Sequence, residues 1–152
     1  MKSINFDEGY KKFIINGDES RFIRIRLSDP NLMYRIDNID DKIQELKEKY
    51  KGATDSKALA EFDRVLKALL NETFGTDVCT PVFGDASVLT FIPGTDKLIL
   101  SGFLEAFLPI IKQEIENMAA ALRPEVQKYI EPEFDVDSLS PEQKQALLAK
   151  LQ

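Results

Sequence analysis

The spacing of apolar residues changes near Pro30, and this change limits the folds that the chain can adopt. Between Arg21 and Leu27, apolar residues occupy every second position, which is the pattern of a strand with one buried face. After Pro30 the apolar residues lie alternately four and three apart, which is the heptad pattern of a helix with one narrow stripe. The chain therefore combines strand and helix, and an α+β fold is predicted. The stripe of the helix consists of Leu32, Ile36, Ile39, Ile43, Leu46 and Tyr50.

A β-hairpin is predicted at the N-terminal end of this pattern. The apolar run Phe13–Ile15 precedes a cluster of turn residues, Asn16–Ser20, and the alternating strand follows. Ile4–Phe6 could add a short third strand. Because two strands alone are only marginally stable in water, the small sheet is expected to pack on a helical core.

The first two predicted helices cover residues 30–50 and 55–73. Asp55 or Ser56 can cap the N-terminus of the second helix, and Gly75 suits the left-handed residue after its C-terminus. The heptad stripe of the first helix could form a seam between two copies of the chain. Such short stripes belong more often to the core of a single chain, and we predict a core position for this one.

The third predicted helix starts at residue 97 or 101 and reaches 122. Its first half is apolar on nearly all sides, which is typical of a buried central helix. Phe103 and Phe107 lie one turn apart on this helix and are predicted to be core residues. Pro109 is expected to kink or break the helix, because proline lacks the backbone N–H that the helix needs.

The segment 76–95 is predicted to be a loop, because proline and glycine recur along it. A short helical turn or a brief strand around Val88–Ile92 fits the sequence equally well. Cys79, the only cysteine of the chain, lies in this segment. No cationic side chain close in sequence would lower the pKa of its thiol, so Cys79 is expected to be a small buried or loop residue.

After Pro124 the character of the chain changes. Residues 131–137 alternate acids with proline and apolar residues, a composition typical of an extended linker. Ser140–Gln143 follows the capping-box pattern of a helix start. This appended segment should be dispensable for folding but needed for full association with a partner or a second copy. Its candidate partner-binding residues are Phe134, Val136, Leu147, Leu148 and Leu151.

These patterns predict one domain and a tail. The domain covers residues 1–130 and combines a hairpin region, 1–30, with a helical core of three helices, 30–122. The tail, 131–152, is predicted to be a flexible acidic linker followed by a short C-terminal helix.

The absence of histidine restricts the chemistry that this chain can perform. Histidine is the usual general base near neutral pH and the commonest metal ligand in proteins. Ser-His and Cys-His nucleophile pairs and the usual zinc sites are therefore excluded. Neither glycine-rich nucleotide fingerprint is present. We predict no catalytic residue, no cofactor and no metal, and hence a protein that is not an enzyme.

Acidic residues offer the one alternative to this prediction. Asp37, Asp40 and Asp41 could bind a divalent ion, but neighbouring residues on a helix diverge, so a solvated helix face is expected. A pair of carboxylates can hydrolyse glycosides, and 26 acids among 152 residues make chance pairs certain. A carboxylate-dependent hydrolase therefore stays an alternative without any pair that marks it.

The net charge of −6 argues against nucleic acid and against an anionic membrane as partners. The chain shows neither a secretory signal nor an apolar run long enough to cross a membrane, so a cytoplasmic location is expected, in the host cell if the protein is viral. Lys11, Lys12, Arg24 and Arg26 could form a basic strand face, for which nucleic acid would be the most specific partner. We interpret this face as solvated or as protection of a sheet edge, with docking of an acidic protein as a further alternative.

Three short motifs carry a resemblance to a known family. A helix ends in Asn71–Gly75, a second Phe-Gly pair follows at Phe83-Gly84, and a long apolar helix contains Phe103-Leu104. With the hairpin before them and the acidic tail after them, residues 1–122 resemble the small tail assembly chaperones of long-tailed, siphovirus-like phages and prophages of low-GC Gram-positive bacteria.

The resemblance implies a non-enzymatic role. Such proteins associate with the tape-measure protein, keep its long helices soluble and can recruit tail tube subunits. Many also have a longer form made by ribosomal frameshifting. The resemblance offers no catalytic residue to transfer.

We therefore predict a protein-binding chaperone of phage tail assembly, with the tape-measure protein as partner, the tail tube protein as a further candidate and a homo-oligomer left open. A virion structural or adaptor protein is the closest alternative. An open apolar groove would favour a binding protein, whereas a pocket with converging acids would favour the hydrolase.

Overall fold

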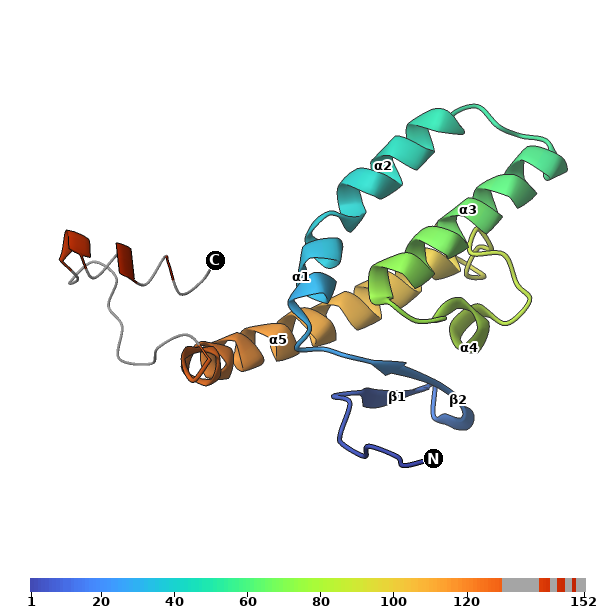
Figure 1. The fold of residues 1–152 in the computed structure, drawn as a ribbon. Coiled ribbons are helices and arrows are strands. Elements are labelled where there is room, and N and C mark those ends of the chain that lie inside the picture. The colour runs from blue at the N-terminus through green and yellow to red at the C-terminus, as the bar shows by residue number, and fades with distance from the viewer. Residues whose placement is uncertain (130–139, 143–144, 147–148, 150–152) are drawn as a thin grey trace. The chain divides into compact units, whose positions relative to one another are not determined.

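In the computed structural model, which describes residues 1–129, 140–142, 145–146 and 149, the chain has an α+β fold (Figure 1). The strands β1 (Lys11–Ile15) and β2 (Asp18–Ile25) pair antiparallel, as the sequence predicts. Asn16 and Gly17 have φ angles of 51° and 75°. Positive φ at both positions is typical of a two-residue type I′ turn, whose twist matches that of the strands. The strand β2 therefore starts inside the predicted turn cluster.

The N-terminal ten residues form no strand, so the predicted third strand at Ile4–Phe6 is wrong. The Asp7 carboxylate accepts a hydrogen bond from the backbone N–H of Gly9, whose φ is 82°. This turn lies just before β1. Ile4 and Phe6 are consequently exposed.

The predicted single helix 30–50 is two helices, α1 (Pro30–Asp37) and α2 (Ile39–Lys49). Asn38 separates them. Its side-chain amide donates a hydrogen bond to the carbonyl oxygen of Tyr34, and such side-chain bonds to the backbone compete with helix continuation. The heptad stripe is nevertheless part of the core, as predicted: Leu32, Ile36, Ile39 and Ile43 are buried, and Leu46 and Tyr50 are half-buried.

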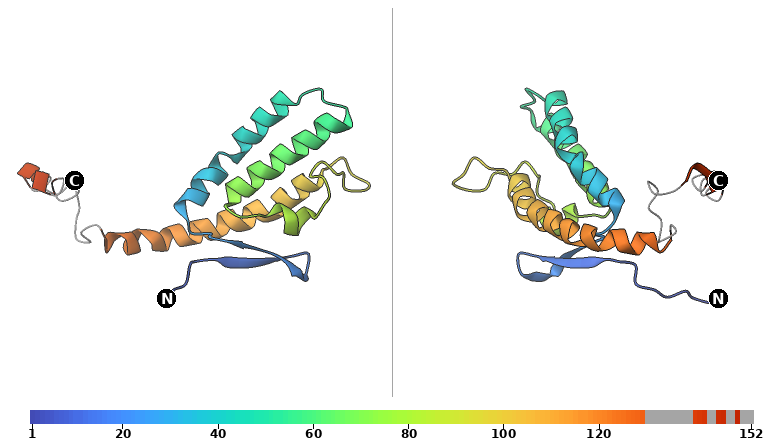
Figure 2. Two further views of the ribbon diagram at one scale, coloured as in Figure 1. Left: turned by 45° about the vertical axis from the view of Figure 1, so that its right-hand side comes forward. Right: turned by 90° about the vertical axis from the view of Figure 1, so that its left-hand side faces the viewer.

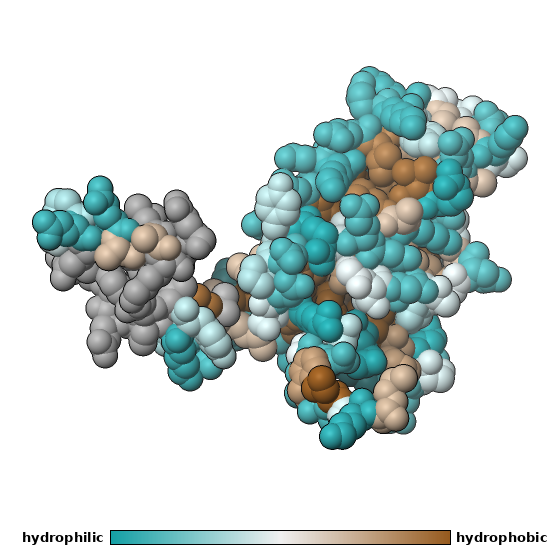
Figure 3. All heavy atoms as spheres, viewed as in Figure 1, coloured by the Kyte–Doolittle hydropathy of each residue, from teal (hydrophilic) through white to brown (hydrophobic). Residues whose placement is uncertain are grey.

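The helix α3 (Ser56–Phe74) has the predicted ends. The Asp55 side chain accepts a hydrogen bond from the backbone N–H of Ala58, and Gly75 adopts the left-handed conformation with φ of 72°. Figure 2 shows α2 and α3 lying side by side. On the face shown in Figure 3, hydrophilic side chains predominate and apolar ones gather where α2 and α3 meet.

The predicted loop 76–95 contains a short helix, α4 (Cys79–Phe83). The side-chain oxygen of Asn71 accepts hydrogen bonds from the backbone N–H groups of Val78 and Cys79 and so fixes its first turn. At the end of the loop, Phe91 and Leu98 form an isolated antiparallel bridge. A short helix therefore lies before residues 88–92. Within these residues, Phe91 forms a single bridge and not part of a strand.

The last long helix, α5 (Ile99–Gln127), continues through Pro109, so of the two expected effects of this proline, a kink or a break, the break is wrong. Its first half is also not buried on all sides. Phe107, Ile111 and Ile115 are buried in the core, and Phe103 is partly buried, whereas Ile110 is exposed. The core thus lies on one side of α5, between this helix, the inner face of the hairpin, and α1 to α4.

The chain divides into two compact units, residues 1–115 and 116–152. In the second unit, Lys128 forms an ion pair with Glu125 at 2.9 Å, and Tyr129 is exposed. Pro141 and Glu142 are helical directly after Ser140, in agreement with the predicted helix start. Both sides of the predicted domain boundary, residues 130 and 131, lie outside the described residues. Across the described part of the chain, the helices are too short or too polar to span a bilayer.

Candidate functional site

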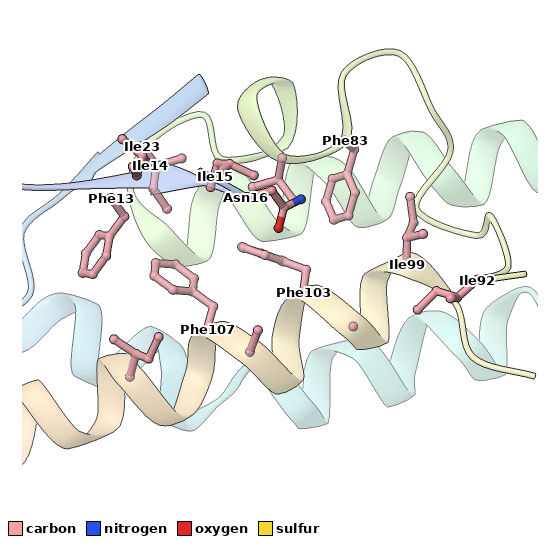
Figure 4. Close-up of a pocket in the computed structure, with 14 residues that line it drawn as sticks. Phe13, Ile14, Ile15, Asn16, Ile23, Phe83, Ile92, Ile99, Phe103 and Phe107 are labelled. Atoms are coloured by element: carbon pink, nitrogen blue, oxygen red, sulfur yellow. The ribbon is translucent and has the colours of Figure 1, made fainter. Parts of the chain in front are cut away.

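An apolar groove of about 430 Å³ lies between the hairpin and the first half of α5 (Figure 4). All its lining residues belong to the first unit. Asn16 is the one polar side chain among them, and none of the lining side chains carries a charge. The lining residues are Phe13, Ile14, Ile15, Asn16, Ile23, Val82, Phe83, Ile92, Ile99, Gly102, Phe103, Ala106, Phe107 and Ile110.

One side of α5 lines the groove and includes two small residues. The successive lining positions of this helix are alternately three and one residues apart, which places them on a single helical face. Gly102 and Ala106 lie one turn apart on that face, where larger residues would fill the space. A Cβ atom on Gly102 would lie only 3.2 Å from the Cδ1 atom of Ile92. Gly102 therefore lets the Ile92 side chain pack closely against α5, while Ala106 is exposed in the groove.

Aromatic rings form one wall of the groove. The ring of Phe103 packs against those of Phe83 and Phe107, with centroids 5.6 and 5.3 Å apart. Phe107 also meets Phe13 of β1 edge-to-face at 5.4 Å. At the rim, Ile14 is 49% exposed and Ile110 is 47% exposed. The groove thus presents apolar surface to solvent beside a packed aromatic wall.

Two polar contacts hold the hairpin over α4 and α5. The guanidinium of Arg21 donates hydrogen bonds to the carbonyl oxygens of Pro81 and Val82, at 2.8 and 2.9 Å. Lys11 forms an ion pair with Glu114 of α5. The sequence pattern does not predict these contacts of Arg21, because its partners are 60 and 61 residues away in the chain.

The outer face of the hairpin is cationic. Lys12 of β1 lies directly opposite Arg24 of β2, and like charges in this position repel one another. The Lys12 Nζ atom lies 4.1 Å from the centroid of the Phe22 ring. The Arg24 and Arg26 guanidinium carbons lie 4.5 and 4.3 Å from the centroid of the Tyr10 ring. We call Lys12, Arg24 and Arg26 the cationic face.

Within the described residues, no carboxylate lies within 4 Å of a nitrogen of the cationic face. The Arg26 guanidinium instead donates a hydrogen bond to the backbone carbonyl of Glu8, at 2.9 Å. The cationic face therefore has aromatic and backbone neighbours but no ion-pair partner in this part of the chain. Lys11, which was predicted to lie on this face, lies on the other face and pairs with Glu114.

The candidate partner-binding residues of the tail lie outside the described residues, and the structure does not place them: Phe134, Val136, Leu147, Leu148 and Leu151. The sequence pattern predicts core positions for Phe103 and Phe107, but it does not predict the groove. Its one local signal is the pair of small residues, Gly102 and Ala106, in the largely apolar first half of α5.

The acidic cluster and the cysteine lie away from the groove. Asp37, Asp40 and Asp41 are exposed on α1 and α2, and the described residues contain no group of three acids or cysteines close enough to hold a metal ion. Burial raises the pKa of the Cys79 thiol to about 12, and the negative charge of Asp77 adds to this effect. A thiol with such a pKa is almost entirely protonated at neutral pH and is a poor nucleophile.

Comparison of the chain with protein-family models, curated proteins and solved structures gives no match.

Proposed function

We propose that this protein is a protein-binding chaperone of phage tail assembly that holds an apolar segment of its client in the groove between the hairpin and α5. The observation that carries the proposal is the groove itself: an uncharged apolar hollow of about 430 Å³ with half-exposed isoleucines at its rim. Exposed apolar surface of this kind is typical of sites that bind proteins or other apolar ligands.

The client in this proposal is the tape-measure protein, and the tail tube protein is a second candidate. This choice rests on the resemblance of the motifs at Asn71–Gly75 and Phe83-Gly84 to tail assembly chaperones. The segments that form the long helices of a tape-measure protein would expose apolar residues before assembly, and an apolar groove could cover them. The proposed place of action is the cytoplasm of the host cell.

A non-enzymatic role is part of the proposal. The groove lining contains no side chain that could act as acid, base or nucleophile, and the chain has no histidine. A carboxylate-dependent hydrolase would require two acids facing one cavity. The adaptor alternative shares the proposed binding site and differs in whether the protein stays in the assembled tail.

Coexpression with the tape-measure protein of the same phage or prophage tests the proposal. The chaperone should increase the fraction of tape-measure protein that stays in solution after centrifugation, and the two should copurify. The Ile110→Glu substitution should abolish both effects, because it places a charge at the groove rim. Leu59→Glu is the matched control, since Leu59 is also on a helix, is 39% exposed and does not line the groove.

Both variants should keep the thermal stability of the parent protein, because both residues are partly solvated already. If Ile110→Glu and the parent protein keep equal amounts of client in solution, the groove is not the binding site. Detection of the protein in purified phage tails would favour the adaptor alternative over the chaperone.

A further inference from the structure

We propose that the client segment binds as an added β-strand along the free edge of β1, with alternate acidic residues against the cationic face and alternate apolar residues in the groove. This inference rests on the proposed function and specifies the kind of segment that the protein recognises. The occupant is an extended protein segment in which acidic and apolar residues alternate.

The first argument is that the groove borders the backbone edge of β1. Phe13, Ile14 and Ile15 are consecutive, and Phe13 and Ile14 pair in regular register with Ile23 and Phe22, so the side chains of these two point to opposite faces of the hairpin. All three nevertheless line the groove, which is possible where the hollow runs beside the strand. In the described residues the sheet has two strands, and β1 pairs only with β2. Within the described residues, the other edge of β1 therefore has no partner strand and can accept one.

The second argument is charge complementarity. A strand added at this edge has one row of side chains above the sheet and one row below it. The row on the inner side would meet the groove rim at Ile110, and the row on the outer side would lie next to Lys12. Carboxylates there would relieve the repulsion between Lys12 and Arg24. The chain has six more acids than bases, so a cationic face without an ion-pair partner among the described residues is a local exception to its composition.

The third argument favours a peptide over a nucleic acid. Proteins that bind single-stranded nucleic acid stack bases on open aromatic rings. Here the Lys12 ammonium lies over the Phe22 ring, and the Arg24 and Arg26 guanidinium groups lie over the Tyr10 ring. The rings are therefore already in contact with cations and less open to bases. The cations themselves are exposed and can pair with anions. Carboxylates spaced two residues apart match this arrangement.

Binding of synthetic peptides to the full-length protein tests the inference directly. The probe is a fluorescent ten-residue peptide of alternating glutamate and valine, measured by fluorescence anisotropy. It should bind saturably, whereas a peptide of alternating lysine and valine should not. Two further peptides carry N-methyl groups on all glutamates or on all valines. Because alternate N–H groups point to opposite edges of a strand, one methylation pattern should abolish binding and the other should preserve it.

Three results of this assay would overturn the inference. They are absence of saturable binding of the glutamate–valine peptide, equal effects of the two methylation patterns, and tighter binding of a dT10 oligonucleotide than of the peptide. The oligonucleotide result would assign the cationic face to nucleic acid instead.

Charge-reversal variants of the protein test whether the peptide binds at the cationic face, where the client is proposed to bind. The double substitution Lys12→Glu with Arg24→Glu should weaken peptide binding by about tenfold or more, the loss expected when a charge-assisted hydrogen bond disappears. Lys47→Glu with Lys49→Glu changes the net charge equally on the exposed side of α2 and should leave binding unchanged.

The same variants separate the two proposals. If the parent protein retains the tape-measure protein in solution and the Lys12→Glu, Arg24→Glu variant does so equally well, the proposed function stands and the strand-addition inference is wrong. If the parent protein fails to retain the tape-measure protein while the peptide binds in the predicted pattern, the assigned client is wrong and the recognition mode stands.

Discussion

Two neighbouring isoleucines on α5 have opposite environments. Ile111 is completely buried against the core, whereas Ile110, one residue earlier, is 47% exposed at the rim of the groove. Their side chains are chemically identical and differ by about 100° in direction around the helix axis. The first half of α5 is therefore one helix with two apolar faces, of which one stabilises the fold and the other is available to a partner.

The difference shows that apolar composition alone does not identify a core. A helix that is apolar all round is normally buried, and this expectation fails on the side of Ala106 and Ile110. That side remains open because the hairpin meets α5 through Phe13 and Lys11, and small residues leave a hollow beside them. Mutations on the two faces should accordingly have different effects on stability and on binding.

The largest loss of stability is expected for Phe107→Ala. The Phe107 ring contacts the rings of Phe13, Phe74 and Phe103, so its removal opens a cavity where the hairpin, α3 and α5 meet. The free energy of unfolding should fall by about 3–5 kcal/mol. Urea denaturation followed by circular dichroism measures this change. A loss below about 1 kcal/mol would mean that this face of α5 is not core.

The neighbouring pair gives the sharpest test of the comparison. Ile111→Ala should reduce the free energy of unfolding by about 2–4 kcal/mol, because the side chain is fully buried. Ile110→Ala should cost less than about 1 kcal/mol, because much of that side chain is solvated already. Client binding should show the reverse order, with Ile110→Ala the weaker binder under conditions where both variants are folded. Equal stability losses would refute the assignment of two faces.

A smaller effect on stability is expected from the titration of Cys79, which is buried in the core. Its pKa is raised by burial from 9.0 to about 12. Above pH 9 the unfolded chain therefore loses the thiol proton while the folded protein keeps it, and stability falls as pH rises. Between pH 9 and 10.5 this group should remove roughly 1–2 kcal/mol from the free energy of unfolding.

Urea denaturation at several pH values, compared between the parent protein and Cys79→Ala, isolates the contribution of this thiol. The alanine variant should lose less stability over the alkaline range. If the free energy of unfolding falls equally with pH in the two proteins, the pKa of the thiol is not raised and its surroundings admit water.

The smallest change in stability is expected from truncation after Ile130. The sequence predicts that residues 131–152 are not needed for folding, so the melting temperature should stay the same. Association with the client or between copies should weaken, as measured by size-exclusion chromatography. A fall of many degrees in the melting temperature would show that the tail belongs to the core.

The features predicted correctly from the sequence depend on local interactions. Asn16-Gly17 sets the hairpin turn through its own backbone, and Asp55 and Gly75 fix the ends of α3 within a few residues. The break at Asn38 is also local, but it was missed because the heptad pattern continues across it without a change of spacing.

The remaining features depend on contacts between distant parts of the chain. The hairpin is held against α4 by Arg21, whose partners Pro81 and Val82 are 60 and 61 residues away. The groove requires the hairpin to settle beside α5, a placement that Arg21 and Lys11 secure through partners 60 or more residues away. Such pairings leave no periodic signal, so a single sequence does not reveal them.

The link between Lys11 and Glu114 also determines when the hairpin can settle during synthesis. These residues are 103 positions apart, and the ribosome adds about 5–20 residues per second. The inner face of the hairpin, including Phe13, therefore has to wait on the order of 5–20 s before its contacts on α5 have been made. During that interval the strand edges are uncovered, and the cations beside them disfavour pairing with other nascent chains.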